Sequence, residues 1–146
     1  MRAIGFFATF LFAATFLHGC LAPDYQTHIC WHIENNTDRT VRVSFMTSEN
    51  HGDTKTIGPY DKVSFSKDTE TRHALGEAES FSHFPARDEC YLYSDDELFR
   101  IWRQSERNDG GKQFFNRRSW SCTPEGTGVP TYNWWFEIDD EDLADR

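Results

Sequence analysis

The sequence predicts an all-β protein, a single antiparallel β-sandwich of about eight short strands. Hydrophobic and polar residues alternate over several short segments, turn-forming clusters separate these segments, and no segment keeps a helical period. Once a signal segment over residues 1–19 is removed, 127 of the 146 residues remain, which is the size of one ordinary domain. We therefore expect one sandwich domain over residues 28–146.

The first half of this domain contains four predicted strands. Residues 29–33 alternate, residues 34–38 form a turn cluster, and residues 41–45 resume the alternation. A polar loop over 48–53 is followed by strands at 54–57 and 63–65, which Gly58-Pro59 separates. Residues 67–88 show no clear period, and we expect a connection there with a brief helix near 74–80.

The second half is predicted to continue as a meander. Residues 90–93 and 98–103 are expected to pair as a hairpin that turns at 94–96, and a second turn at 108–111 returns the chain as a strand over 113–120. A Gly/Pro-rich loop over 121–130 leads to the last strand. That strand places Tyr132, Trp134, Phe136 and Ile138 on one face, and the acidic tail 139–143 is expected to cap the fold as one helical turn.

Residues 1–27 are expected to lie outside the domain. The apolar run 3–17 follows Arg2 and has 15 residues, fewer than the roughly 20 of a membrane-spanning helix, so it predicts a secretory signal peptide over 1–19. Leu17, Gly19 and Cys20 resemble the lipobox of bacterial lipoproteins, and this resemblance implies that Cys20 is lipidated and begins a tether over 20–27. Cleavage after Ala22 is the alternative, but it would put Pro23 at the disfavoured +1 position.

The charge of the chain restricts its partners. Loss of residues 1–19 changes the formal net charge from −9 to −10. An acidic chain is a poor binder of nucleic acid, and anionic lipid surfaces repel it. We therefore expect attachment to a membrane through acyl chains on Cys20 and no nucleic-acid partner. Leu21 after that cysteine resembles the pattern that sorts lipoproteins to the outer membrane of diderm bacteria.

Three cysteines remain after Cys20, namely Cys30, Cys90 and Cys122. Export into an oxidising compartment predicts one disulfide and one free thiol. In the predicted meander, Cys90 and Cys122 belong to strands about 9.6 Å apart, whereas a disulfide requires Cα atoms within roughly 7 Å. We therefore expect a Cys30–Cys122 disulfide and a buried, free Cys90.

Two regions are candidates for ligand binding. Residues 98–120 carry six basic residues against two acidic ones, with Arg100 and Trp102 as candidate contacts for an acidic glycan or an acidic partner. In the last strand, Trp135 points away from the core beside Asn133 and Glu137, which suits a sugar platform. The alternatives are a solvated face paired with carboxylates in the first region, and cover by the 67–88 loop or the tail in the second.

Metal binding and catalysis have weaker signals. His28, Cys30 and His32 share one face of a strand and suit zinc or copper, but they extend over roughly 13 Å, so we favour a disulfide at Cys30 beside two solvated histidines. The chain contains none of the familiar nucleophile, zinc-protease or phosphate-loop motifs. The sequence therefore predicts no metal, no cofactor and no enzymatic activity.

Short motifs at 33–37, 41–43, 57–59 and 136–143, together with the lipobox, resemble those of small uncharacterised bacterial lipoproteins. This resemblance implies a location in the cell envelope and a single β-sandwich-like domain. From it we expect a structural or interaction module of the envelope. A module that binds a carbohydrate or another small ligand is the second expectation, and a hydrolase is the third.

Overall fold

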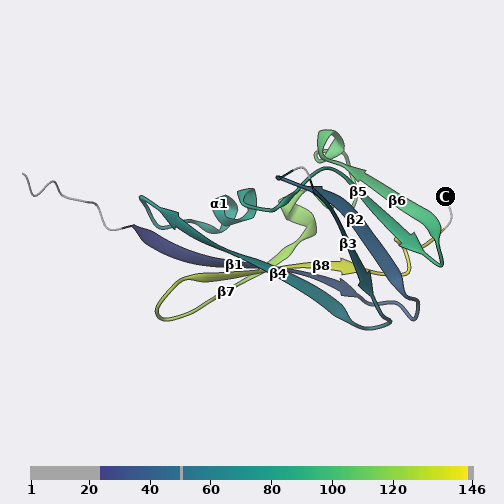
Figure 1. The fold of residues 1–146 in the computed structure, drawn as a ribbon, viewed down its shortest axis with the longest axis horizontal. Coiled ribbons are helices and arrows are strands. Elements are labelled where there is room, and N and C mark those ends of the chain that lie inside the picture. Colours follow the sequence, from purple (N-terminus) through teal and green to yellow (C-terminus); the bar gives the residue numbers. More distant parts are fainter. Residues whose placement is uncertain (1–23, 50, 145–146) are drawn as a thin grey trace, which may run out of the picture.

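The computed structural model describes residues 24–49 and 51–144 and forms an all-β sandwich, as the sequence predicts (Figure 1). The first sheet has the order β4-β1-β8-β7, and the second sheet has the order β3-β2-β5-β6. The first sheet contains β4 (Lys62–Thr71), β1 (Tyr25–Asn35), β8 (Thr131–Ile138) and β7 (Ser121–Glu125). The second sheet contains β3 (Gly52–Ile57), β2 (Val41–Thr47), β5 (Ala86–Ser94) and β6 (Glu97–Arg103).

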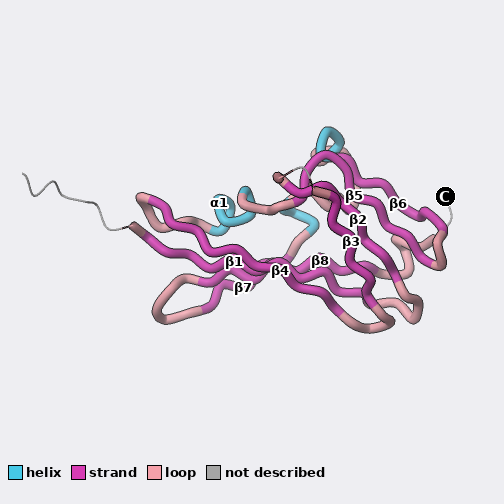
Figure 2. Tube along the Cα trace, viewed as in Figure 1, coloured by secondary structure: helices cyan, strands magenta, loops and turns pink. Residues whose placement is uncertain are grey.

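All adjacent strands pair antiparallel except β1 and β8, which run parallel at the centre of the first sheet. Short helical segments make up the rest of the regular structure (Figure 2). They are α1 (Glu77–Ser82), η1 (Gln104–Glu106) and η2 (Arg117–Ser119). β1 begins at Tyr25, within the predicted tether, and Cys20 and the signal segment lie outside the described residues.

The core follows the alternation of the strands. On β1 the odd-numbered residues from Thr27 to Asn35 are buried, while the even-numbered residues between them face the other side of the sheet. On β8 the buried residues are Trp134, Phe136 and Ile138. An aromatic cluster joins the two sheets, with the rings of Phe114, Trp120 and Phe136 packed within 5.4 Å of one another, centroid to centroid.

The α1 helix covers the part of the first sheet that the second sheet does not reach. Figure 1 shows α1 and the second sheet on the same side of the first sheet. The Trp134 indole Nε1 donates a 3.0 Å hydrogen bond to Ser80 Oγ, and the Tyr132 hydroxyl donates a 2.8 Å bond to the Leu75 carbonyl. The 67–88 segment therefore packs against the inner face of this sheet, where Trp134 lies.

The predicted hairpin at 94–96 is confirmed. Asp95 and Asp96 both have positive φ, at 48° and 64°, as a two-residue type I′ turn requires, and they connect β5 to β6. The predicted helix near 74–80 is present as α1, a few residues further along the chain. The structure therefore divides the predicted 67–88 connection among the end of β4, α1 and the beginning of β5.

The predicted strand over 113–120 is wrong. These residues form turns and η2, and they insert Phe114, Phe115 and Trp120 into the core. Because this segment does not pair beside β6, the predicted meander is absent from the described chain. The eighth strand is instead β7, which lies in the predicted 121–130 loop and pairs with β8.

Candidate functional site

The outer face of the first sheet is the side that points away from the core. We define this face by the even-numbered residues 28–34 of β1 and 62–70 of β4, together with the odd-numbered residues 131–137 of β8 and 121–125 of β7. The registers place these side chains in rows across four strands. The helix and the second sheet pack on the opposite side of the sheet, so neither of them covers this face (Figure 1).

Trp135 is the tryptophan that marks this face. Of the five tryptophans in the chain, the other four are buried, and each is at most 6% exposed. Trp135 is half-buried, and its ring stacks on His32 at a centroid distance of 4.0 Å. The ammonium group of Lys62 lies 4.6 Å from the indole centroid. The predicted division between a core Trp134 and an outward-facing Trp135 is therefore confirmed.

A groove of about 500 Å³ runs beside Trp135 at the edge of the sheet. It forms because β7 begins at Ser121, opposite Trp135, so the end of β8 extends past the last pair between these strands. The segment 111–121 lies across this edge and supplies the second wall. The lining residues are Gly111, Lys112, Arg118, Ser119, Trp120, Ser121, Trp135, Glu137 and Asp139.

The groove brings together parts of the two binding regions that the sequence predicts. Trp135 and Glu137 come from β8, while Lys112 and Arg118 come from the basic stretch. Lys112 is held by Asp139, at 3.0 Å between Nζ and Oδ2, and by Asp142. Arg118 forms no ion pair with any residue that the structure describes, so its guanidinium group is the cation available to a ligand here.

A second cluster lies on the same outer face, around Cys30. His28 Nδ1 lies 2.6 Å from Asp68 Oδ1, and His28 Nε2 lies 3.2 Å from Cys30 Sγ. Partial burial, together with the negative charges of Asp68 and Glu125, raises the pKa of the Cys30 thiol. Neighbouring His32 has separate partners, Ser64 Oγ at 2.6 Å and Asn133 Oδ1 at 3.3 Å.

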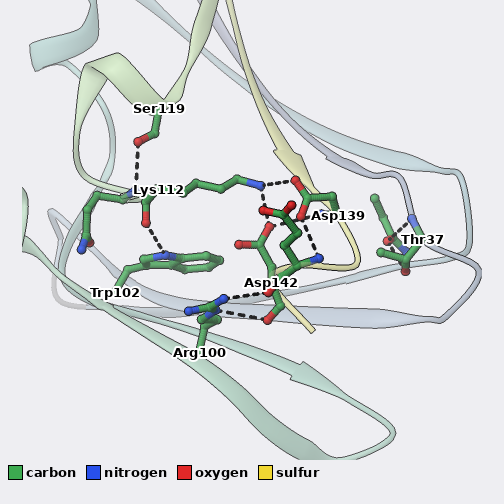
Figure 3. A network of polar contacts seen from close by, with 10 residues as sticks. Thr37, Arg100, Trp102, Lys112, Ser119, Asp139 and Asp142 are labelled. Carbon is green, nitrogen blue, oxygen red and sulfur yellow. Dashed lines mark hydrogen bonds and ion pairs between the residues drawn. The ribbon is translucent and has the colours of Figure 1, made fainter. Parts of the chain in front are cut away.

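Two predicted ligand contacts, Arg100 and Trp102, belong instead to a C-terminal network, which we define as Arg100, Trp102, Lys112, Asp139 and Asp142 (Figure 3). Trp102 is only 3% exposed, and its Nε1 donates a 3.2 Å hydrogen bond to the Lys112 carbonyl. Arg100 donates hydrogen bonds to the carbonyls of Glu141 and Asp142. A ligand cannot reach the Trp102 ring, so its predicted role as a ligand contact is wrong.

The predicted Cys30–Cys122 disulfide is not formed, because Cys30, Cys90 and Cys122 are all free thiols. Cys30 of β1 lies opposite Asn133 of β8 in the sheet register. Cys122 of β7 lies opposite Trp134 of β8, which faces inward. The two sulfurs therefore lie on opposite faces of the first sheet, with β8 between their strands. The prediction failed because it placed Cys122 after a strand that does not exist.

The prediction that Cys90 is a buried, free thiol is confirmed. Burial raises the pKa of Cys90 far above its usual range and that of Cys122 to about 11.

The outer face also contains residues that sequence reasoning missed. Asp68 and Lys62 both come from β4, and their contacts with β1 and β8 depend on the strand register. Among the residues described, no group of three or more histidines, cysteines or acids is arranged to hold a metal ion. No helix in the described part of the chain is both long and apolar enough to span a membrane.

Comparison with protein-family models found no match, and comparison with curated proteins also found none.

Proposed function

We propose that this protein is an exported, lipid-anchored module of the cell envelope, and that it binds its partner through the outer face of the first sheet. The observation that supports this most is the position of Trp135, the one tryptophan that is not buried in the core. Tryptophan is enriched at the energetic centres of protein interfaces, where it supplies a large contact area. The flanking His32, Asn133 and Glu137 add hydrogen-bonding groups around it.

The second sheet is a weaker candidate for the interface because its outward charges already pair with one another. Arg42 forms a 2.8 Å ion pair with Asp96 and lies over the Tyr93 ring, and Arg103 pairs with Glu89. A partner would have to break these contacts before using the same groups. The outer face of the first sheet, in contrast, adjoins a groove that contains Arg118, which has no ion-pair partner among the described residues.

The proposed anchor places this surface close to the membrane. Cys20 and Tyr25 are five residues apart, a span of roughly 18 Å at full extension. Two or three acyl chains would make attachment nearly permanent, since each buried methylene contributes about 0.8 kcal/mol. In this proposal the partner is another component of the envelope, and the outer membrane is the expected site.

The anchor is tested by intact mass and by cell fractionation. The wild-type protein is expected to begin at an acylated Cys20 and to be extracted with membranes, whereas Cys20→Ser releases the domain into the soluble fraction. An unmodified Cys20, or a mature chain that begins downstream of it, would contradict the anchor.

The binding surface is tested by photo-crosslinking in living cells. Ser66, on the outer face, and Thr56, on the outward face of the second sheet, are each replaced by p-benzoylphenylalanine in separate variants. We expect a discrete adduct from position 66 and none from position 56. Adducts from position 56 alone, or from neither position, would refute the proposed surface.

A second candidate function, the binding of an acidic sugar, is favoured by the groove itself. A sugar ring can stack on an aromatic ring such as that of Trp135, while the Arg118 guanidinium suits a carboxylate on the same ligand. Titration of the protein with a panel of acidic and neutral oligosaccharides tests this. Both Trp135→Ala and Arg118→Ala should weaken the binding of an acidic sugar, whereas Arg107→Ala, outside the groove, should not. Binding that survives both groove variants would exclude the groove.

A further inference from the structure

Three side chains on the outer face of the first sheet form a continuous chain from a carboxylate to a thiol. Asp68 Oδ1 contacts His28 Nδ1 at 2.6 Å, and His28 Nε2 contacts Cys30 Sγ at 3.2 Å. Asp68 is on β4, and the other two residues are on β1, where they are next neighbours on the same face. The group is accessible, since the side chains of His28 and Asp68 are 37% and 88% exposed.

The order of these contacts determines which His28 nitrogen holds the proton. An ionised carboxylate only accepts hydrogen bonds, so the Nδ1 atom facing Asp68 must carry its hydrogen. In a neutral imidazole the other nitrogen is then a free acceptor. Nε2 therefore points its lone pair at Cys30 Sγ, which is the arrangement of a nucleophile beside a base that a third group orients.

The Cys30 thiol has the properties that make such a base useful. It is free, and Ser66 on β4 and Asn133 on β8 are its neighbours across the sheet. Because the surroundings raise its pKa, the thiol is protonated at neutral pH and needs a base to become a nucleophile. Among the three described cysteines, Cys30 is the one with a histidine nitrogen against its sulfur.

We propose that Cys30 is a reactive thiol that exchanges with small-molecule disulfides, with His28 as its general base and Asp68 as the residue that positions His28. Cys30 Sγ gives its proton to His28 Nε2 and attacks one sulfur of the disulfide. The S–S bond of the small molecule breaks, a new S–S bond forms to Cys30, and the departing thiolate takes the proton from His28. The products are a mixed disulfide on Cys30 and one free small thiol.

The test measures mixed-disulfide formation with oxidised glutathione at each cysteine of the full mature protein, by peptide mass mapping over time. We expect Cys30 to react at least about tenfold faster than Cys122, which is partly buried and has no hydrogen bond to a histidine among the described residues. His28→Gln should lower the rate of mixed-disulfide formation at Cys30 by at least about tenfold, since general-base catalysis accelerates reactions by roughly 10²–10⁴-fold.

His73→Gln is the matched control, because exposed His73 also pairs with a carboxylate, Glu79 at 3.2 Å, but lies outside the outer face. This variant should leave the Cys30 rate unchanged. In urea, where the fold is lost, wild type and His28→Gln should react at the same rate. Equal folded-state rates for wild type and His28→Gln, or a Cys30 rate no greater than that of Cys122, would overturn the proposal.

Asp68 is tested as a positioning residue. Asp68→Asn removes the charge that holds the hydrogen on Nδ1, so it should slow Cys30, and Asp68→Glu should restore part of the rate. The melting temperature should stay the same in both variants, because Asp68 is a highly exposed side chain. If Asp68→Asn leaves the rate at the wild-type value, Asp68 has no positioning role and that part of the proposal is wrong.

Discussion

The C-terminal network and the outer face of the first sheet contain the same kinds of residues but use them differently. Both combine basic side chains with aromatic rings. In the C-terminal network the Trp102 ring is buried, and Arg100 and Lys112 hold the carbonyls and carboxylates of the last turn (Figure 3). On the outer face, His32 and Lys62 pack against Trp135, which remains partly open to solvent.

The difference shows what makes a cation–aromatic cluster structural. Another segment covers the C-terminal network, because 112–120 and the tail close over β6 and β8. No described element closes over the outer face in the same way (Figure 1). Amino-acid composition alone therefore does not identify a binding site. Whether a neighbouring segment covers the cluster determines whether a ligand can reach it.

The largest expected effect comes from the buried ring of the C-terminal network. Trp102→Ala should lower the free energy of unfolding by about 3–5 kcal/mol, because it empties a core position and removes the bond to the Lys112 carbonyl. Trp102→Phe, which keeps a ring but loses the N–H group, should cost less. Urea denaturation measures both variants. A cost below about 1 kcal/mol for Trp102→Ala would mean that the ring is not packed.

A smaller effect is expected from the buried carboxylate of the same network. Asp142 is 3% exposed and accepts hydrogen bonds from Lys112 Nζ and from the Asp139 backbone N–H. Asp142→Asn should cost about 1–3 kcal/mol, since it removes a charged partner from a partly buried ammonium group. The control is Asp140→Asn at an exposed position, which should change stability by less than about 0.5 kcal/mol. Equal losses would show that Asp142 has no special role.

The network should also make stability depend on acid pH. Burial acts to raise the pKa of Asp139, but hydrogen bonds and charge from Lys112, with the backbone N–H groups of Glu141 and Asp142, outweigh it and lower the pKa. A carboxyl group whose pKa is lowered by folding stabilises the fold at pH values above its unfolded-state pKa, about 3.9. This contribution is lost as the pH falls through the folded-state pKa.

The melting temperature should therefore fall below about pH 4, and Lys112→Met should reduce that fall. The variant is needed for comparison because the pKa values of Glu79 and Glu89 are lowered as well. Identical acid profiles for wild type and Lys112→Met would contradict the role of Lys112.

The smallest expected effect is on the outer face. Trp135→Ala should lower the free energy of unfolding by under about 1 kcal/mol, the scale of a cross-strand ring pair. Trp134→Ala, one residue away on the inner face, should cost about 3–5 kcal/mol. If both substitutions destabilise the protein equally, Trp135 is packed rather than available, and the proposed binding surface loses its central residue.

The sequence alone determined the features that depend on local pattern. Alternation and turn signals together identified seven of the strands. Alternation also placed Trp134 inside and Trp135 outside, because successive side chains of a strand must point to opposite faces. The turn at 94–96 followed from polar residues that stand between two strand-like segments. The buried state of Cys90 followed in the same way from its place beside Leu92.

Only the tertiary structure decided which segments meet. The run 113–120 contains Phe114, Phe115 and Trp120, but it packs them into the core as an irregular segment, so the meander and the disulfide inferred from it were wrong. The contact of Asp68 with His28, and that of Lys62 with Trp135, depend on the register between β4, β1 and β8. The strand register and the covering of one segment by another both arise from the packing of segments distant in sequence. Local periodicity therefore cannot predict either of them.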